Sequence, residues 1–195
     1  MNCLSWEPHF PEQFDETITQ KMRAYWHRSA LLDAVMMVIG QWTPIVMLSL
    51  IVLASTGWLL SNAEAGIALH SAFFAILAAL LARVVNEPIS RWANRPRPFE
   101  REVDGALLDH EEGKAFPSNH ATGAFALAMS FTLVPGYYEI LLGLAVLLAI
   151  SRVYSGLHHI TDIFAGALHG TLVAWLVIYA FVRLHLVYKR FHRCI

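Results

Sequence analysis

Long stretches without a charged residue constrain this chain more than any other feature. Among its 195 residues, 56% are hydrophobic and 15% are charged, whereas about 25% of residues are charged in soluble domains. Five runs contain no Asp, Glu, Lys or Arg: 34–63, 65–82, 115–138, 140–151 and 163–182. Because a helix needs about 20 apolar residues to cross the hydrocarbon core of a bilayer, the pattern predicts an all-α, polytopic membrane helix bundle with about five transmembrane helices.

Two of these runs do not match one perpendicular helix. The run 140–151 is too short alone, so we expect it to extend from Tyr137 to Tyr154, with these tyrosines at the two membrane interfaces. The first run is longer than one helix requires and contains Pro44. We therefore expect its membrane helix at 41–61, preceded by an interfacial segment.

The pattern divides the chain into three parts. We expect an N-terminal interfacial segment at 1–40, a transmembrane domain at 41–186 and a basic C-terminal tail at 187–195. Within 15–32, apolar residues recur at spacings near three and four, which is typical of a helix lying on the bilayer surface. The apolar residues of this pattern are Phe14, directly before the segment, and Ile18, Met22, Tyr25, Trp26 and Leu32 within it. A helix that caps the bundle itself is an equally good interpretation.

The positive charges indicate how the bundle is oriented. The formal net charge is −1, which leaves no basic surplus for a nucleic-acid partner. Four cations lie within the last thirteen residues: Arg183, Lys189, Arg190 and Arg193. The positive-inside rule therefore predicts a cytoplasmic C-terminus. A second cluster argues for the opposite orientation unless several of its members are held inside a site: Arg91, Arg95, Arg97, Arg101 and Lys114.

Three polar clusters are predicted to meet on one membrane face. They are 94–98 after the second expected span, 117–120 at the start of the third, and 151–162 between the fourth and the fifth. A turn at 135–136 makes the third and fourth spans a hairpin, so connectivity alone puts the three clusters on the same face. Ionisable groups at membrane-helix ends usually face a bundle interior or an aqueous cavity, so this convergence predicts a functional site.

The clusters contain groups suited to phosphate recognition. Arg97 and Arg152 each offer a planar fork of donors that matches phosphate oxygens. Ser118, at the predicted start of a helix, adds a hydroxyl group and the N–H groups of a positive helix end. Taken singly, each residue also has an ordinary structural interpretation, because interfacial arginines contact lipid headgroups and serines cap helices.

His158 and Asp162 are four residues apart, which is the spacing of a hydrogen-bonded pair on one helix face. The carboxylate would then accept a hydrogen bond from one imidazole nitrogen and leave the other nitrogen to attack phosphorus. His120, from a separate helix, is a candidate to protonate the leaving oxygen. A simple surface pair is the alternative interpretation, and His159 is the second choice for the reactive histidine.

Together these residues resemble the three-part signature of the type-2 phosphatidic acid phosphatase superfamily, which includes membrane lipid phosphatases and shares its site with vanadium haloperoxidases. The matching elements are Arg97-Pro98, Pro117-Ser118-Asn119-His120, and Ser151-Arg152 followed by His158 and Asp162. The resemblance extends over residues 65–185 and leaves the N-terminal segment unassigned.

The resemblance implies a role for each matching residue. His158 becomes transiently phosphorylated, Asp162 orients its ring, and His120 protonates the leaving group. The residues expected at the phosphate are Arg97, Ser118, Asn119 and Arg152. The family needs no metal, so no cofactor is expected.

Two positions depart from the family pattern. Ser90 stands where the first motif normally has Lys, seven residues before Arg97, and Arg91 or Arg95 is the candidate replacement. Asn119 stands where many members have Gly, so the backbone approaches a phosphate less freely there.

These departures, the compact layout and the string FPSNHATGA at 116–124 resemble the bacitracin-resistance type of undecaprenyl-diphosphatase. Such enzymes act on the outer face of the bacterial inner membrane and remove the terminal phosphate of a polyprenyl diphosphate, which recycles the carrier lipid of the cell wall. The expected substrate is therefore a polyprenyl diphosphate lying among membrane lipids. One alternative is a phosphatase for phosphatidate or phosphatidylglycerophosphate. The other is a lipid-binding or transport module without catalysis, and the missing Lys of the first motif favours this second alternative.

Overall fold

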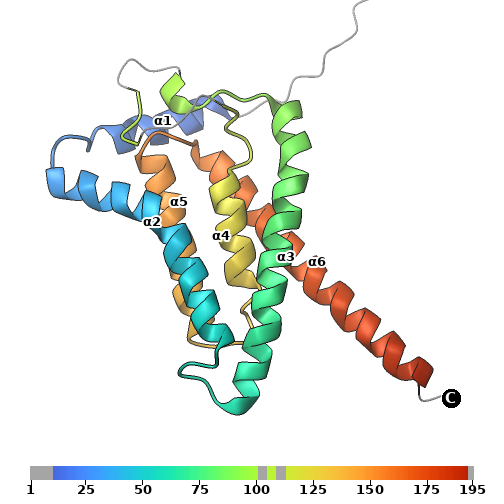
Figure 1. The fold of residues 1–195 in the computed structure, drawn as a ribbon. Coiled ribbons are helices and arrows are strands. Elements are labelled where there is room, and N and C mark those ends of the chain that lie inside the picture. The colour runs from blue at the N-terminus through green and yellow to red at the C-terminus, as the bar shows by residue number, and fades with distance from the viewer. Residues whose placement is uncertain (1–10, 101–104, 109–112, 193–195) are drawn as a thin grey trace, which may run out of the picture.

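The computed structural model is all-helical over the residues that it describes, which are 11–100, 105–108 and 113–192, with side chains up to residue 184. In chain order its elements are α1 (Glu12–Arg23), α2 (Ala30–Ser55), α3 (Asn62–Ala93), the 3-10 turn η1 (Pro98–Glu100), α4 (Asn119–Met129), α5 (Tyr137–Tyr154) and α6 (Ile160–His192) (Figure 1). The predicted all-α membrane bundle is confirmed. Four of the cations named in the sequence analysis have side chains outside the described residues: Arg101, Lys189, Arg190 and Arg193.

Four helical stretches in the described part are long and apolar enough to cross a membrane: Ala30–Ser55, Asn62–Glu100, Tyr137–Tyr154 and Ile160–Leu184. The third expected span, at 115–138, instead contains α4, which has 11 residues and a length of about 16 Å. A turn then leads from α4 into α5. In the described residues, the bundle therefore has four helices that could span a membrane and the short helix α4.

The short helix α4 lies in the middle of the bundle and packs against α3, α5 and α6 (Figure 1). Small residues such as Ala121 and Ala128 form its buried face. A Cβ atom added at Gly166 of α6 would lie 2.6 Å from the carbonyl oxygen of Ser118, so the two backbones approach closely. Because other helices surround α4, this apolar segment contacts protein and does not need to reach both membrane surfaces.

Pro44 lies inside α2, and the helix bends in this region. Figure 1 shows the first turns of α2 lying across the bundle and the later turns running along it. A proline within a helix removes one backbone hydrogen bond and clashes with the carbonyl group of residue i−4, here Gly40. The bend coincides with the expected change from an interfacial segment to a membrane helix near residue 41, although α2 is continuous from Ala30 to Ser55.

The helix α1 lies across one end of the bundle and packs on α5 and α6 (Figure 1). Its residues Ile18 and Met22 contact a buried cluster that includes Val153 and Ile163. The apolar stripe of this segment thus faces protein at these two positions. Of the two interpretations of residues 15–32, the structure favours a cap on the bundle.

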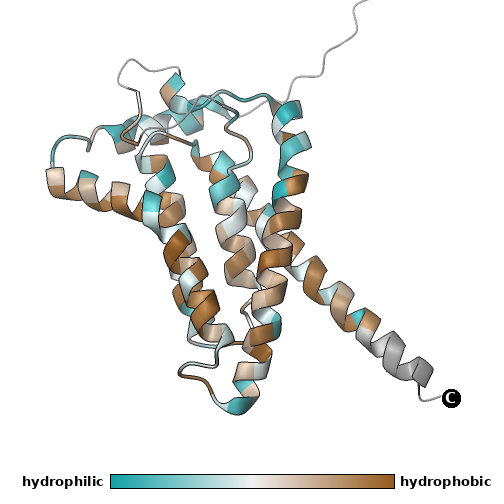
Figure 2. Cartoon of the chain, in the orientation of Figure 1, coloured by the Kyte–Doolittle hydropathy of each residue, from teal (hydrophilic) through white to brown (hydrophobic). Residues whose placement is uncertain are grey.

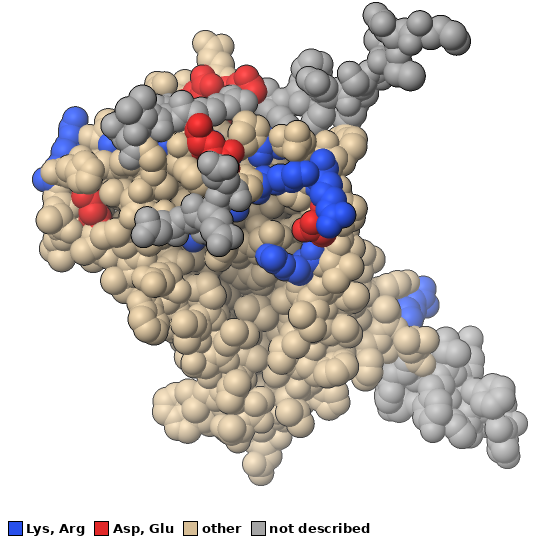
Figure 3. Space-filling view, turned by 45° about the horizontal axis from the view of Figure 1, so that its top comes forward, with Lys and Arg blue, Asp and Glu red and all other residues tan. Residues whose placement is uncertain are grey.

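The end that carries α1 is the polar end of the molecule. Figure 2 shows hydrophilic residues gathered there, while hydrophobic residues cover the lengths of α2 and α3. In Figure 3, most of the charged side chains in view lie at the same end, above a body with few charges. This is the face on which connectivity predicted the polar clusters.

Candidate active site

Backbone hydrogen bonds bring the three polar clusters together next to α1. The N–H of Ala115 donates to the carbonyl oxygen of Arg95 at 2.8 Å, which joins the segment before α4 to the segment after α3. The N–H of Ser118 donates to the carbonyl oxygen of Asp162 at 3.0 Å, which joins the start of α4 to the first turn of α6. The convergence predicted from connectivity is therefore present in the structure.

The carboxylate of Asp162 is fully buried, and both of its oxygens are bound. Nη1 of Arg95 donates to Oδ1 at 2.6 Å. Oδ2 accepts the backbone N–H of His159 at 2.8 Å and lies 3.2 Å from Nδ1 of the same residue. Because a buried carboxylate is unfavourable without partners, Arg95 and His159 together hold Asp162 in place and charged.

The ring of His158 is buried, with 2% of the residue exposed, and lies between α5 and α6. Its Nδ1 is 3.0 Å from the carbonyl oxygen of Ala115. Since a carbonyl group can only accept a hydrogen bond, this contact places the proton of the neutral ring on Nδ1 and the lone pair on Nε2. Asp162 was expected to accept this bond, but its Oδ2 lies 3.8 Å from Nδ1. The backbone of Ala115 therefore fixes the ring, and the carboxylate supports it from a greater distance.

Burial lowers the pKa of His158 below its ordinary value of 6.5. The positive charges of Arg97 and Arg152 lower this pKa further, while Asp162 opposes them. At pH 7 the ring is therefore neutral, and its Nε2 lone pair is available as a nucleophile.

Arg97 and Arg152 carry buried nitrogen atoms that have no hydrogen-bond partner among the described residues. In Arg152, which is 4% exposed, both Nε and Nη2 lack an acceptor. In Arg97, Nη1 lacks one, although Nε donates to the carbonyl oxygen of Gly113 at 3.3 Å. A buried cation without an acceptor is strongly unfavourable. The charges of both guanidinium groups also lower the pKa of His158. The two groups thus indicate a binding site for an anion next to this histidine.

A cavity of about 510 Å³ opens onto this anion site. Arg152 and His120 line it, together with Met37 and Gln41 of α2 and with Leu107. Within the described ranges, no group of three or more His, Cys, Asp or Glu side chains is arranged to hold a metal ion. The polar side chains that line the cavity are Arg152, His120 and Gln41, which all offer donors to a phosphate.

The helix α4 begins at this site. Ser118 is its N-cap, is fully buried, and accepts the N–H of Ala121 on Oγ at 3.4 Å. The next residues, Asn119 and His120, are half-buried. Oδ1 of Asn119 accepts a hydrogen bond from Nδ2 of Asn86 at 2.9 Å, so this side chain is already partly engaged. The second motif thus supplies a capped helix start beside the two arginines.

Comparison with known proteins identifies the family. The pattern of the PAP2 superfamily matches residues 71–185, which is more than half of the chain. The chain belongs to the PAP2 superfamily.

Known proteins resemble this chain over between half and nearly nine-tenths of its length. The undecaprenyl-diphosphatase BcrC of Bacillus subtilis is 28% identical over 153 residues, covering 77% of this chain and 75% of that protein. Phosphatidylglycerophosphatase B of the same organism is 35% identical over 107 residues, covering 49% and 50%. The crystal structure of a transmembrane PAP2-type phosphatidylglycerolphosphate phosphatase from B. subtilis matches with a TM-score of 0.66 at 27% identity, covering 88% of this chain and 86% of that one. The chain is thus a PAP2 membrane lipid phosphatase whose relatives are named for different lipids.

Sequence reasoning missed one residue of this PAP2 site, Asp15 of α1, which is fully buried. Its Oδ2 accepts hydrogen bonds from Nη2 of Arg95 and Oγ1 of Thr161, both at 2.5 Å. Its Oδ1 accepts the backbone N–H of Thr161 at 3.1 Å. A signal was present in the sequence, since Asp15 lies three and seven residues before Ile18 and Met22 and so falls on the apolar stripe of its helix, where a carboxylate is unexpected.

The two candidate replacements for the Lys of the PAP2 first motif both have carboxylate partners. Arg95 is held between Asp15 and Asp162. Arg91 is exposed and pairs with Glu87 at 2.8 Å. Neither arrangement directs a guanidinium group at the anion site, which argues against both as replacements for the Lys that Ser90 lacks.

Removal of the Asp15 carboxylate is expected to lower both stability and activity. Breaking a buried ion pair by removing one partner costs about 3–5 kcal/mol, because the other charge stays buried without its acceptor. We expect Asp15→Ala to lower the melting temperature in detergent and to lose most of the lipid phosphatase activity. Gln20→Ala, at an exposed position of the same helix, serves as the matched control. Wild-type melting and wild-type phosphate release by Asp15→Ala would contradict this role.

Proposed function

We propose that this PAP2 phosphatase hydrolyses a polyprenyl diphosphate, and specifically undecaprenyl diphosphate, to the lipid monophosphate and inorganic phosphate without a metal. The observation that carries the proposal is that Arg97 and Arg152, whose charges act on the neutral ring of His158, each have a buried guanidinium nitrogen with no acceptor in the described part of the chain. Arg97 and Arg152 come from different segments and match a terminal phosphate group held from two sides. The product is the carrier lipid in the form that cell-wall synthesis uses again.

The first step transfers the terminal phosphoryl group to His158. Nε2 attacks phosphorus, an N–P bond forms, and the bond from phosphorus to the bridging oxygen breaks. His120 donates a proton to that oxygen, which leaves as part of the lipid monophosphate. The charge of the transferred group is stabilised by donors that are already in place. These donors are Arg97, Arg152, Ser118 and the backbone N–H of Asn119 in the first turn of α4.

The second step releases phosphate from the histidine. Water attacks the phosphorus atom, His120 accepts the proton of this water, and the N–P bond breaks, which restores neutral His158. The Ala115 carbonyl group holds the Nδ1 proton during both steps. Asp162, at 3.8 Å, stabilises the positive charge that the ring carries while its Nε2 bears the phosphoryl group.

The proposed substrate class is supported by similarity to the BcrC enzyme over 77% of the chain. Phosphatidate or phosphatidylglycerophosphate is the second candidate, which the 35% identity to phosphatidylglycerophosphatase B favours over half of the chain. Both candidates use the same residues, because the three motifs contact the phosphate group and not the lipid tail.

We place the site on the outer face of the bacterial inner membrane, with the C-terminus in the cytoplasm. The cluster that argued against this orientation included Arg95 and Arg97. Arg95 is buried between two carboxylates, and Arg97 is half-buried at the anion site. These two cations therefore contribute little to the positive-inside comparison, which weakens the objection, and the four cations of the C-terminal end support a cytoplasmic C-terminus.

Fusions at the C-terminus test this orientation. Green fluorescent protein becomes fluorescent in the cytoplasm, whereas alkaline phosphatase becomes active outside it. We expect the first fusion to fluoresce and the second to be inactive in cells that make comparable amounts of both. The reverse pattern would contradict the proposed orientation.

The purified protein is expected to release phosphate from undecaprenyl diphosphate in EDTA, in preference to phosphatidate and phosphatidylglycerophosphate. His158→Ala should reduce release to the background of the assay, because the nucleophile is lost. His159→Ala should keep a substantial fraction, because its backbone N–H continues to bind Oδ2 of Asp162.

Each alternative predicts a different outcome of this assay. Preference for phosphatidylglycerophosphate or phosphatidate would favour the second candidate substrate and keep the mechanism. No release from any of the three lipids would favour a binding or transport module. Equal losses in the two histidine variants would contradict the assignment of His158 as the nucleophile.

A further inference from the structure

Arg83 of α3 is a cation that the mechanism above does not use. It follows directly after the charge-free run 65–82 and lies ten residues, or about 15 Å, before α3 ends at Ala93. Unlike Arg91 and Arg95, it forms no ion pair or hydrogen bond with any residue in the described part of the chain. Its guanidinium group is therefore available to a ligand at the edge of the apolar surface.

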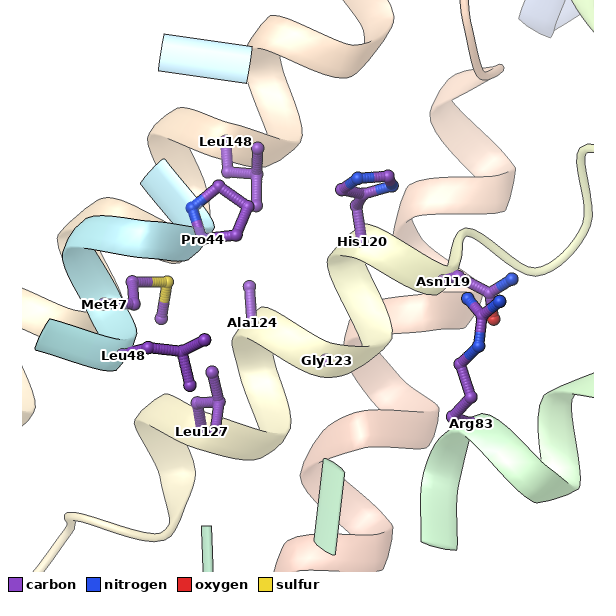
Figure 4. A pocket seen from close by; sticks show the side chains of 10 residues that line it. All are labelled: Pro44, Met47, Leu48, Arg83, Asn119, His120, Gly123, Ala124, Leu127 and Leu148. Carbon is purple, nitrogen blue, oxygen red and sulfur yellow. The ribbon is translucent and has the colours of Figure 1, made fainter. Parts of the chain in front are cut away.

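A cavity of about 190 Å³ joins Arg83 to the start of α4 (Figure 4). At one end, the side chain of Arg83 lies beside Asn119, and His120 projects from the same turn of α4. Apolar side chains of α2, α4 and α5 form the remaining wall, chiefly Met47, Leu48, Leu127 and Leu148. Arg83 and Asn119 also line a neighbouring cavity of about 430 Å³ whose other walls are mostly apolar. A cation at the mouth of an apolar cavity matches an anionic group that carries a lipid chain.

His120 stands between two cavities that each contain one arginine. One is the cavity with Arg152 at the anion site, and the other is the cavity with Arg83. In the proposed reaction, His120 protonates the bridging oxygen of the diphosphate. The terminal phosphate then lies on the side of Arg152, and the phosphate that stays on the lipid lies on the opposite side of the bridging oxygen, toward Arg83.

We propose that Arg83 binds the retained phosphate of a diphosphate lipid and so selects diphosphates over monophosphates. This inference rests on the proposed function. A monophosphate ester such as phosphatidate presents a neutral ester group at this place, which gives the guanidinium group no anion to bind. The contribution of Arg83 is therefore specific to substrates that have a second phosphate, whereas Arg97 and Arg152 serve every lipid phosphate.

Substrates with two phosphates and with one phosphate test this assignment most sharply. kcat/KM is measured by phosphate release from a polyprenyl diphosphate and from a monophosphate ester, either the matching prenyl monophosphate or phosphatidate. We expect Arg83→Gln to lower kcat/KM for the diphosphate about 10–100-fold, as for the loss of a charge-assisted hydrogen bond. The monophosphate should change less than about threefold, since it makes no such bond. Arg83→Lys, which keeps the charge, should restore most of the diphosphate activity.

Arg183→Gln is the matched control, because Arg183 is an exposed arginine of α6 that contacts Tyr179. It should leave both substrates at wild-type values, and the melting temperatures of all three variants should match that of the wild type. Equal losses on both substrates, or an unchanged diphosphate rate in Arg83→Gln, would overturn the assignment while the proposed function stands. A wild-type protein that releases no phosphate from the polyprenyl diphosphate would overturn the proposed function and this inference together.

Discussion

The buried guanidinium group of Arg95 is the interaction on which this site depends. It binds Asp15 of α1 and Asp162 of α6 at once, and both carboxylates are inaccessible to solvent. Each of these charges is tolerated inside the protein only because the others are present. The end of α3, the cap α1 and the first turn of α6 are thereby joined. Asp162 extends the arrangement, because its side chain binds His159 and its carbonyl group binds the start of α4.

The arginines of this end of the molecule differ in their partners, and these partners indicate different roles. Arg95 has two carboxylate partners and stabilises the fold. Arg97 and Arg152 have buried donors without acceptors in the described part of the chain, which is typical of groups that bind an anionic substrate. Arg83 lies where the polar end meets the apolar body, beside a cavity with apolar walls. In our account, different arginines therefore hold the site together, bind the reacting phosphate and recognise the phosphate that stays on the lipid.

Hydrophobic patterning predicted the bundle well and the central helix poorly. Four of the five charge-free runs correspond to the four long helices, and Tyr137–Tyr154 matches α5 residue for residue. The run 115–138 failed as a span because its small residues pack against protein, and hydropathy alone does not distinguish a helix that faces lipid from one that faces other helices. The three motifs were predicted to meet, and they do. Asp15 was missed because its partners are 80 and 146 residues away. The Ala115 carbonyl group that fixes His158 belongs to the backbone, which side-chain patterns do not reveal.

The central claim is that Nε2 of His158 accepts the phosphoryl group. It is tested most directly by mixing the purified enzyme with a polyprenyl diphosphate radiolabelled at its terminal phosphate, quenching within milliseconds in alkaline detergent, and mapping the label by proteolysis and mass spectrometry. Phosphohistidine is labile in acid and survives in base. The account predicts a base-stable label on the peptide that contains His158, chasing to free phosphate and absent in His158→Ala. Label on His159 or another residue, or full turnover without any labelled protein, would contradict it.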